Sequence, residues 1–151
     1  MILISACLAG INCRYDGGSK QIDEIEKLIK EGKAVLVCPE QLGGLPTPRI
    51  PCEIRDGDGG SVLERSAAVY NREGANLTDC FIRGAEETLK IAKLYGVEKA
   101  ILKARSPSCG KDRIYDGSFQ KKVTHGDGVT AALLRKHGIL VLDEEDFREY
   151  I

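Results

Sequence analysis

Residues 99–110, KAILKARSPSCG, join a run of apolar residues to a turn-forming segment that contains Cys109. Three similar runs occur at residues 1–6 (MILISA), 33–38 (KAVLVC) and 139–142 (ILVL). Each run is almost continuously apolar and does not alternate with polar residues, which is typical of parallel strands buried on both faces. The four runs therefore predict a small parallel sheet.

The segments between these runs have the spacing of amphipathic helices. Apolar residues recur three or four positions apart in residues 22–32, 77–96 and 126–138, and each segment reaches a glycine where a left-handed C-cap is expected. Strands that alternate with helices indicate right-handed crossovers and helices on both faces of the sheet. We expect one α/β domain over residues 1–151, with a small, mainly parallel sheet and flanking helices in a Rossmann-like three-layer arrangement.

Residues 39–75 interrupt the alternation of strands and helices, because they contain four of the five prolines and many glycines. A loop of this length in a small domain usually has a function or contains its own hairpin. We expect a hairpin over residues 52–65, CEIRDGDGGSVLER, with DGDGG at its tip.

Composition restricts the class of protein. Lys and Arg total 22, Asp and Glu total 23, and the basic residues form no run, so we expect no strong nucleic-acid surface. No apolar stretch approaches the length of a bilayer span, and the first residues lack the basic segment of a secretory signal. We expect a cytoplasmic protein without membrane contact, and no sequence feature marks a subunit interface.

Six cysteines in a reducing compartment fit metal ligands, catalytic groups or core positions better than disulfides. Cys7 follows the first predicted strand, Cys38 ends the second and Cys109 lies shortly after the third. Because the carboxyl ends of parallel strands meet at one edge of a sheet, we expect these three thiols to share one pocket. Cys13 and Cys52 are expected in loops, where each is either a spare thiol or a further ligand.

Three converging thiolates are compatible with several chemistries. No close pair of cysteines marks a structural zinc site. Thiolates are the usual ligands of iron–sulfur clusters, and a cluster held by only three of them leaves one iron open to act as a Lewis acid. Two alternatives stay open at this point, a non-catalytic iron–sulfur or metal-binding module and a metal-free thiol enzyme.

Several motifs occur together along the chain. They are SACLAG (5–10), CRYDG (13–17), VCPEQLGGLPTPR (37–49), KARSPSCG (103–110), IYDGSF (114–119) and GDGVTAALLRKHGI (126–139). In combination they resemble the thiouracil desulfidases, a characterised branch of a bacterial and archaeal family long described as a domain of unknown function. The resemblance implies a 4Fe-4S cluster held by Cys7, Cys38 and Cys109, with the fourth iron free.

The resemblance also implies a non-redox reaction. Water replaces the sulfur of a small thiolated base such as 2-thiouracil, and the sulfur leaves as hydrosulfide. It further implies a glutamate and a serine near the open iron, for which Glu40 and Ser106 are the matching candidates. A carboxylate in a closed pocket can take a proton from water, and Ser106 can relay a proton or hold the base by a hydrogen bond.

Further residues near the expected ligands are candidates for binding the substrate: Arg14, Asp16, Arg49 and Ser108. An alternative role for the three charged residues is to pair with each other and brace the loops. Asp127, within GDG, is expected to cap the N-terminus of the last helix.

Overall fold

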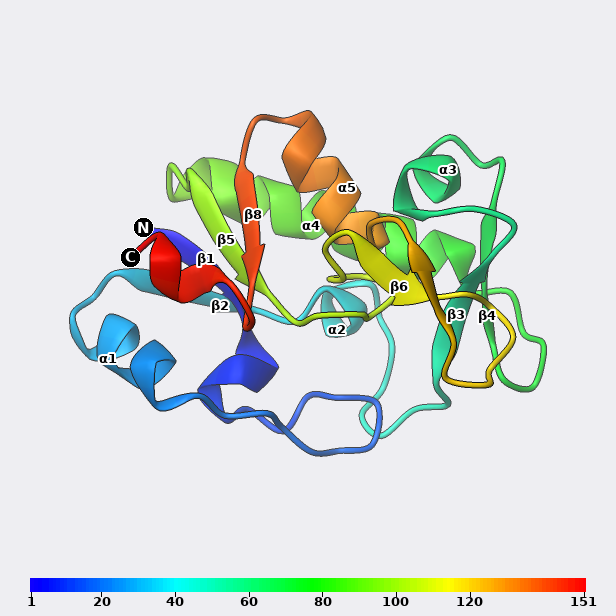
Figure 1. The fold of residues 1–151 in the computed structure, drawn as a ribbon, viewed down its shortest axis with the longest axis horizontal. Helices are drawn as coiled ribbons and strands as arrows, with labels where there is room; N and C mark the ends of the chain where they lie inside the picture. The colour runs from blue at the N-terminus through cyan, green and yellow to red at the C-terminus, as the bar shows by residue number, and fades with distance from the viewer.

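The computed structural model describes residues 1–151 and contains a central sheet, two hairpins and five α-helices (Figure 1). The sheet is formed by β1 (Ile2–Ser5), β2 (Ala34–Val37), β5 (Lys99–Leu102) and β8 (Leu140–Asp143). All neighbouring strands are parallel, in the order β2-β1-β5-β8. The predicted parallel sheet is confirmed, and every strand end lies within one residue of its predicted position.

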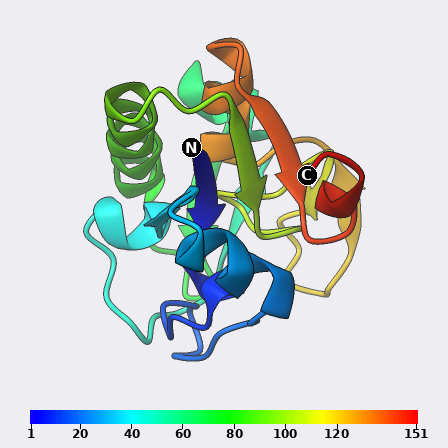
Figure 2. The same cartoon turned by 90° about the vertical axis from the view of Figure 1, so that its left-hand side faces the viewer.

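Helices cover both faces of the sheet. They include α1 (Asp23–Lys30), α4 (Thr78–Leu94) and α5 (Val129–Lys136). Leu3 packs in a core with residues of α4 and α5, whereas its neighbour Ile4 packs in a second core with α1 and the 3-10 turn η2 (Phe147–Glu149). Figure 2 shows α4 and η2 on opposite sides of the strands. Because neither Leu3 nor Ile4 is exposed, both faces of β1 need apolar residues, which explains the continuous apolar run and confirms three layers.

The three predicted helices are confirmed, and so are their terminating glycines. Gly32, Gly96 and Gly138 follow the helices with φ angles of 70°, 61° and 79°. This left-handed region costs a residue with a Cβ free energy, so glycine ends each helix without strain. No helix of the structure is both long enough and apolar enough to cross a bilayer.

The long segment after β2 folds differently from the prediction. It forms β3 (Cys52–Arg55), α3 (Gly59–Leu63) and β4 (Ala68–Asn71). β3 and β4 pair antiparallel, so a hairpin starts at Cys52 as predicted, but its second strand lies at residues 68–71, beyond the predicted range of 52–65. The reason is Asp58, whose carboxylate accepts the Ser61 N–H at 2.9 Å and forms a capping box that starts α3 where a hairpin tip was expected.

Four shorter elements complete the fold: η1 (Ala6–Ala9), α2 (Pro39–Leu42), β6 (Arg113–Tyr115) and β7 (Val123–His125). β6 and β7 form the second hairpin. The long helix α4 runs from the sheet to the two hairpins (Figure 1), and its residues Phe81 and Ala85 pack in a third core with Ile54 and Ile114. The hairpins are thus fixed opposite the carboxyl edge of the sheet.

Candidate active site

A cavity of about 390 Å³ lies at the carboxyl ends of β1, β2 and β5, with residues of both hairpins on its walls. Five of the six cysteines line it: Cys7, Cys13, Cys38, Cys52 and Cys109. All are free thiols. β1 lies between β2 and β5, so β2 is added to the sheet on one side of β1 and β5 on the other side. Open parallel sheets bind ligands at the carboxyl edge where the strand order reverses in this way. The structure therefore brings Cys7, Cys38 and Cys109 to one cavity, as predicted.

The other two cavity cysteines lie deeper than the sequence indicated. Cys13 is only 2% exposed, and its carbonyl accepts a hydrogen bond from the thiol of Cys38 at 3.7 Å. Cys52, which was expected in a loop, is the first residue of β3 and is also buried. The fourth and fifth thiols thus belong to the site and are not spare surface groups.

Three thiols of the cavity, those of Cys38, Cys52 and Cys109, hold their protons strongly. Burial raises the pKa of Cys109 to about 11, although a hydrogen bond from the hydroxyl of Ser5 at 3.4 Å lowers it. The pKa of Cys38 is raised by its hydrogen bond with Cys13 and by burial. Each thiol therefore has to lose its proton to bind a metal.

The loop that carries Cys109 is held by the first turn of α5. The N–H of Val129 donates to the carbonyl of Pro107, and the N–H of Thr130 donates to the carbonyl of Ser108, both at 2.8 Å. Both N–H groups belong to the first turn of α5, where no carbonyl of the same helix is available to accept them. The SPSCG and GDGVT segments are therefore two halves of one structural unit.

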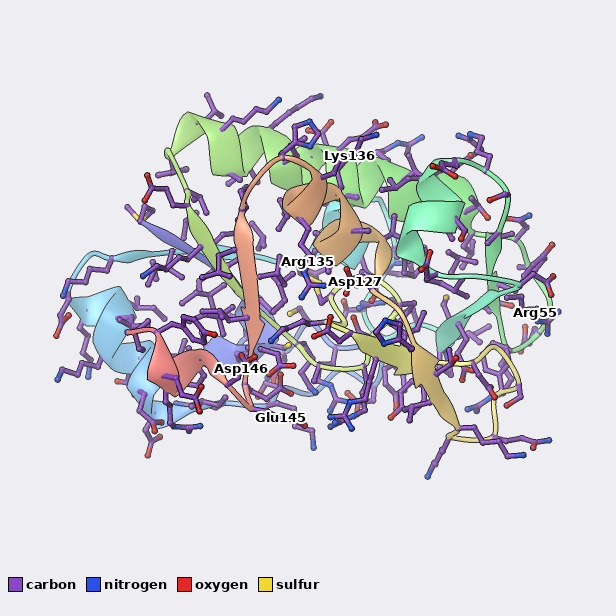
Figure 3. The ribbon with its side chains drawn as sticks, turned by 45° about the horizontal axis from the view of Figure 1, so that its top comes forward. Arg55, Asp127, Arg135, Lys136, Glu145 and Asp146 are labelled. Atoms are coloured by element: carbon purple, nitrogen blue, oxygen red, sulfur yellow. The ribbon has the colours of Figure 1, made fainter.

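Asp127 does not cap α5, contrary to the prediction. Gly128 is the N-cap residue, and the Asp127 carboxylate accepts hydrogen bonds from Arg135 (2.9 and 3.0 Å) and from the N–H of Asp112 at 2.8 Å (Figure 3). The first-turn amides of α5 already have partners in the cysteine loop. A Cβ on Gly128 would lie 2.5 Å from the carbonyl carbon of Ser108, so this close contact requires glycine.

Glu40 reaches the cavity because α2 starts directly after Cys38. Its Oε1 accepts a hydrogen bond from Nε of Arg49 at 3.0 Å, and its Oε2 accepts one from Ser108 at 2.8 Å. The Arg49 side chain is 6% exposed and also donates to the carbonyl of Cys13 at 3.0 Å. Arg49 thus compensates the Glu40 charge and braces the loop of Cys13, which favours the bracing alternative over substrate binding.

Ser106 and Ser108 form a hydroxyl chain that ends at Glu40. The Oγ of Ser106 accepts the N–H of Cys109 at 2.7 Å and lies 3.2 Å from the Oγ of Ser108. Ser108 donates its own hydroxyl proton to Glu40, which leaves its oxygen free to accept from Ser106. Ser106 is half-buried at the cavity and Ser108 is 2% exposed, so protons can pass between the cavity and Glu40 along this chain.

Arg14 lines the cavity, whereas Asp16 does not. The Asp16 carboxylate is 46% exposed, lies 3.6 Å from Arg14 and accepts the N–H of Gly18 at 2.9 Å. These contacts stabilise a turn. The structure places Asp16 outside the cavity, and the substrate-binding role of Asp16 stays a prediction.

The cavity is strongly basic, which the sequence did not indicate. The charged residues that line it are Arg14, Lys20, Arg49, Arg72, Lys103, Arg105 and Lys121, with Glu40 and Glu53. Lys20, Arg72 and Lys121 have no carboxylate within 4.0 Å. These three come from separate segments of the chain, so no local motif could have identified them.

Comparisons with known proteins agree with this geometry. A sequence model of a family described as 2-thiouracil desulfurase matches residues 2–146. The chain is 45% identical to the uncharacterized protein YbbK of Bacillus subtilis (strain 168) over 151 residues, which cover 100% of both chains. A solved structure of the 4Fe-4S-dependent thiouracil desulfidase TudS is 45% identical and has a TM-score of 0.88, covering 98% of this chain and 93% of that chain. The chain described here belongs to the 2-thiouracil desulfurase family.

Proposed function

We propose that the protein is a desulfidase that replaces the sulfur of a thiolated pyrimidine base with oxygen, using a 4Fe-4S cluster held by Cys7, Cys38 and Cys109. The observation that carries this proposal is that three thiols, each from a segment that follows a strand of the sheet, share one cavity with Glu40. The family match and the likeness to TudS support the same reaction.

The residues present fit such a cluster. Thiolates are its usual ligands, and these three project from separate elements into a cavity of about 390 Å³. No group of three His, Cys, Asp or Glu side chains is arranged to hold a single metal ion, as a closed zinc site requires. When bound, a cluster with three protein ligands supplies one open iron, a Lewis acid with an affinity for sulfur.

The protein groups around this position supply the proton transfers. Glu40 acts as the general base that takes a proton from the attacking water. Arg49, at 3.0 Å, keeps the negative charge of Glu40 compensated within the cavity. Ser106 is the cavity end of the hydroxyl chain, so it carries a proton between the substrate and Glu40 by way of Ser108.

The unpaired basic residues favour a substrate that carries negative charge. Lys20, Arg72 and Lys121 line the cavity without an acidic partner, and an anionic group such as a phosphate would compensate them. We therefore propose that a thiolated base with an attached anionic group binds more tightly than the neutral base.

The test is sulfide release by anaerobically reconstituted protein from thiouracil and from thiouracil carried on a nucleoside monophosphate. We expect sulfide and the corresponding oxo base in equal amounts, with a lower KM for the charged compound and a KM that rises with salt. Cys109→Ala should lose the iron and the activity. Cys80→Ala, which removes the one cysteine outside the cavity, is the matched control and should keep both. Protein with a full complement of iron that releases no sulfide from either compound would refute the proposal.

A second candidate function follows from the position of Cys13, which is buried and lines the same cavity as Cys7 and Cys38. If Cys13 served as a fourth ligand, the cluster would be closed and the protein would be a non-catalytic iron–sulfur module. Mössbauer spectra distinguish the two functions, because an open iron is distinct from the other three and a fully ligated cluster has no such iron.

A further inference from the structure

The IYDGSF motif (114–119) has no part in the proposed proton transfers, yet it helps to form the cavity wall. Tyr115 and Phe119 line the cavity, as does Lys121 just beyond the motif. We propose, on the basis of the function proposed above, that Phe119 is the surface on which the substrate ring stacks and that Glu53 is the residue that positions it.

Glu53 is a buried carboxylate that holds the loop in place. It is 8% exposed, and its Oε1 accepts the N–H of Gly117 at 3.0 Å and the N–H of Phe119 at 3.1 Å. One carboxylate oxygen of β3 thus fixes two amides of the loop between β6 and β7. Hydrogen bonds from amides to a charged acceptor are among the stronger ones in proteins.

The backbone of the loop also lies directly against β3. Gly117 has a φ of 92°, and a Cβ there would lie 2.7 Å from the carbonyl oxygen of Ile54. Only glycine combines this φ with this contact at low cost. The loop is therefore anchored on both sides of its turn, by Gly117 and by the amide of Phe119.

Two guanidinium groups hold the Phe119 ring. One belongs to Arg55, the last residue of β3, and the other to Arg72, which directly follows β4. Arg55 and Arg72 lie 5.9 and 6.0 Å from the ring centroid, which is cation–π distance. Arg55, seen on this hairpin in Figure 3, also donates from Nε to the carbonyl of Gly117 at 3.4 Å. The ring is thus fixed in the cavity wall before any ligand binds, which lowers the entropy cost of binding.

Phe119 is the aromatic residue of the wall best suited to hold a base. Of the three aromatic side chains that line the cavity, Tyr15 is 42% exposed, and Tyr15 and Tyr115 each carry a hydroxyl. A flat phenyl ring offers a pyrimidine a stacking partner that needs no particular hydrogen-bond pattern. Stacking would select cyclic, aromatic thiocarbonyl compounds over acyclic ones such as thiourea.

The experiment compares Phe119→Leu, which keeps an apolar side chain without a ring, with three variants of the acidic residues. For Phe119→Leu we expect the KM for thiouracil to rise about ten-fold, kcat to stay within about two-fold, and preference over thiourea to fall. Glu53→Ala should raise KM similarly, and Glu53→Gln should restore it because an amide oxygen still accepts both N–H groups. Glu73→Ala, a change at an exposed turn outside the cavity, is the control.

Adding Phe119→Leu to Glu53→Ala should raise KM no further, because both changes remove the same ring from its position. The proposal is overturned if Phe119→Leu leaves KM unchanged, if the two effects simply add, or if Glu53→Gln raises KM as much as Glu53→Ala does. Binding of uracil, measured by calorimetry and independent of turnover, should weaken about ten-fold in Phe119→Leu. That measurement separates this inference from the proposed function, since the binding result stands even for a protein that releases no sulfide.

Discussion

The close contact between α2 and α4 decides whether a glycine-to-alanine change in α4 stabilises or destabilises the protein. Gly43, at the end of α2, and Gly84, within α4, bring the two backbones together. A Cβ on Gly84 would lie 2.0 Å from the carbonyl oxygen of Pro39, and a Cβ on Gly43 would lie 2.0 Å from that of Cys80. Because α2 directly follows Cys38 and carries Glu40, this contact positions two residues of the active site.

Gly84→Ala should destabilise the protein, although alanine is the better helix former. In a solvent-facing helix the change would stabilise by up to about 1 kcal/mol. Here the new Cβ needs at least 3.0 Å where 2.0 Å is present, so α2 must move away by about 1 Å. Forced repacking of this kind costs about 1–3 kcal/mol, so we expect a net loss of roughly 1–2 kcal/mol. The displacement of Glu40 should lower kcat on the order of 100-fold.

Equilibrium urea unfolding and sulfide release would measure the two effects. Gly60→Ala in α3 is the matched control, because a Cβ there meets nothing closer than 3.4 Å. We expect the control to be at least as stable as the parent protein and as active. A Gly84→Ala variant that gains stability and keeps full activity would show that the two backbones do not touch as described.

Three further predictions concern single side chains. Glu40→Gln should keep about four irons per chain while kcat falls at least about 100-fold, and an undiminished kcat would exclude Glu40 as the base. Cys13→Ser should retain the iron content and the visible spectrum of the parent, whereas loss of iron would make Cys13 a ligand. Burial raises the pKa of Asp143, so the folded state loses stability as pH rises through the ionisation of this group. Asp143→Asn, which keeps an acceptor for the N–H of Glu145, should therefore melt higher than the parent at pH 7 but not near pH 3, and equal melting at pH 7 would contradict this.

The part of the fold that was predictable is the part governed by local pattern. Strands such as β1 are apolar on both faces because both faces are covered, and that pattern is visible in the sequence. The shared position of Cys7, Cys38 and Cys109 follows from this pattern. Parallel strands bring their carboxyl ends to one edge of the sheet, and each cysteine follows one of these strands.

The remainder depends on tertiary contacts that have no local signal. The DGDGG segment has the composition of a hairpin turn, yet Asp58 forms a capping box and starts a helix. Asp127 precedes a helix and would suit a cap, yet its carboxylate binds Arg135 from the next turns of the same helix. Glu53 and Phe119 lie more than 60 residues apart and meet only through the packing of two hairpins.

The central claim is that the three thiols hold an open iron–sulfur cluster, and iron content tests it most directly. Protein purified and reconstituted without oxygen should contain about four irons and four acid-labile sulfides per chain, with a broad absorption shoulder in the visible range. Cys109→Ala should contain almost none. A folded parent protein without bound iron, or a Cys109→Ala variant with the full content, would contradict the account.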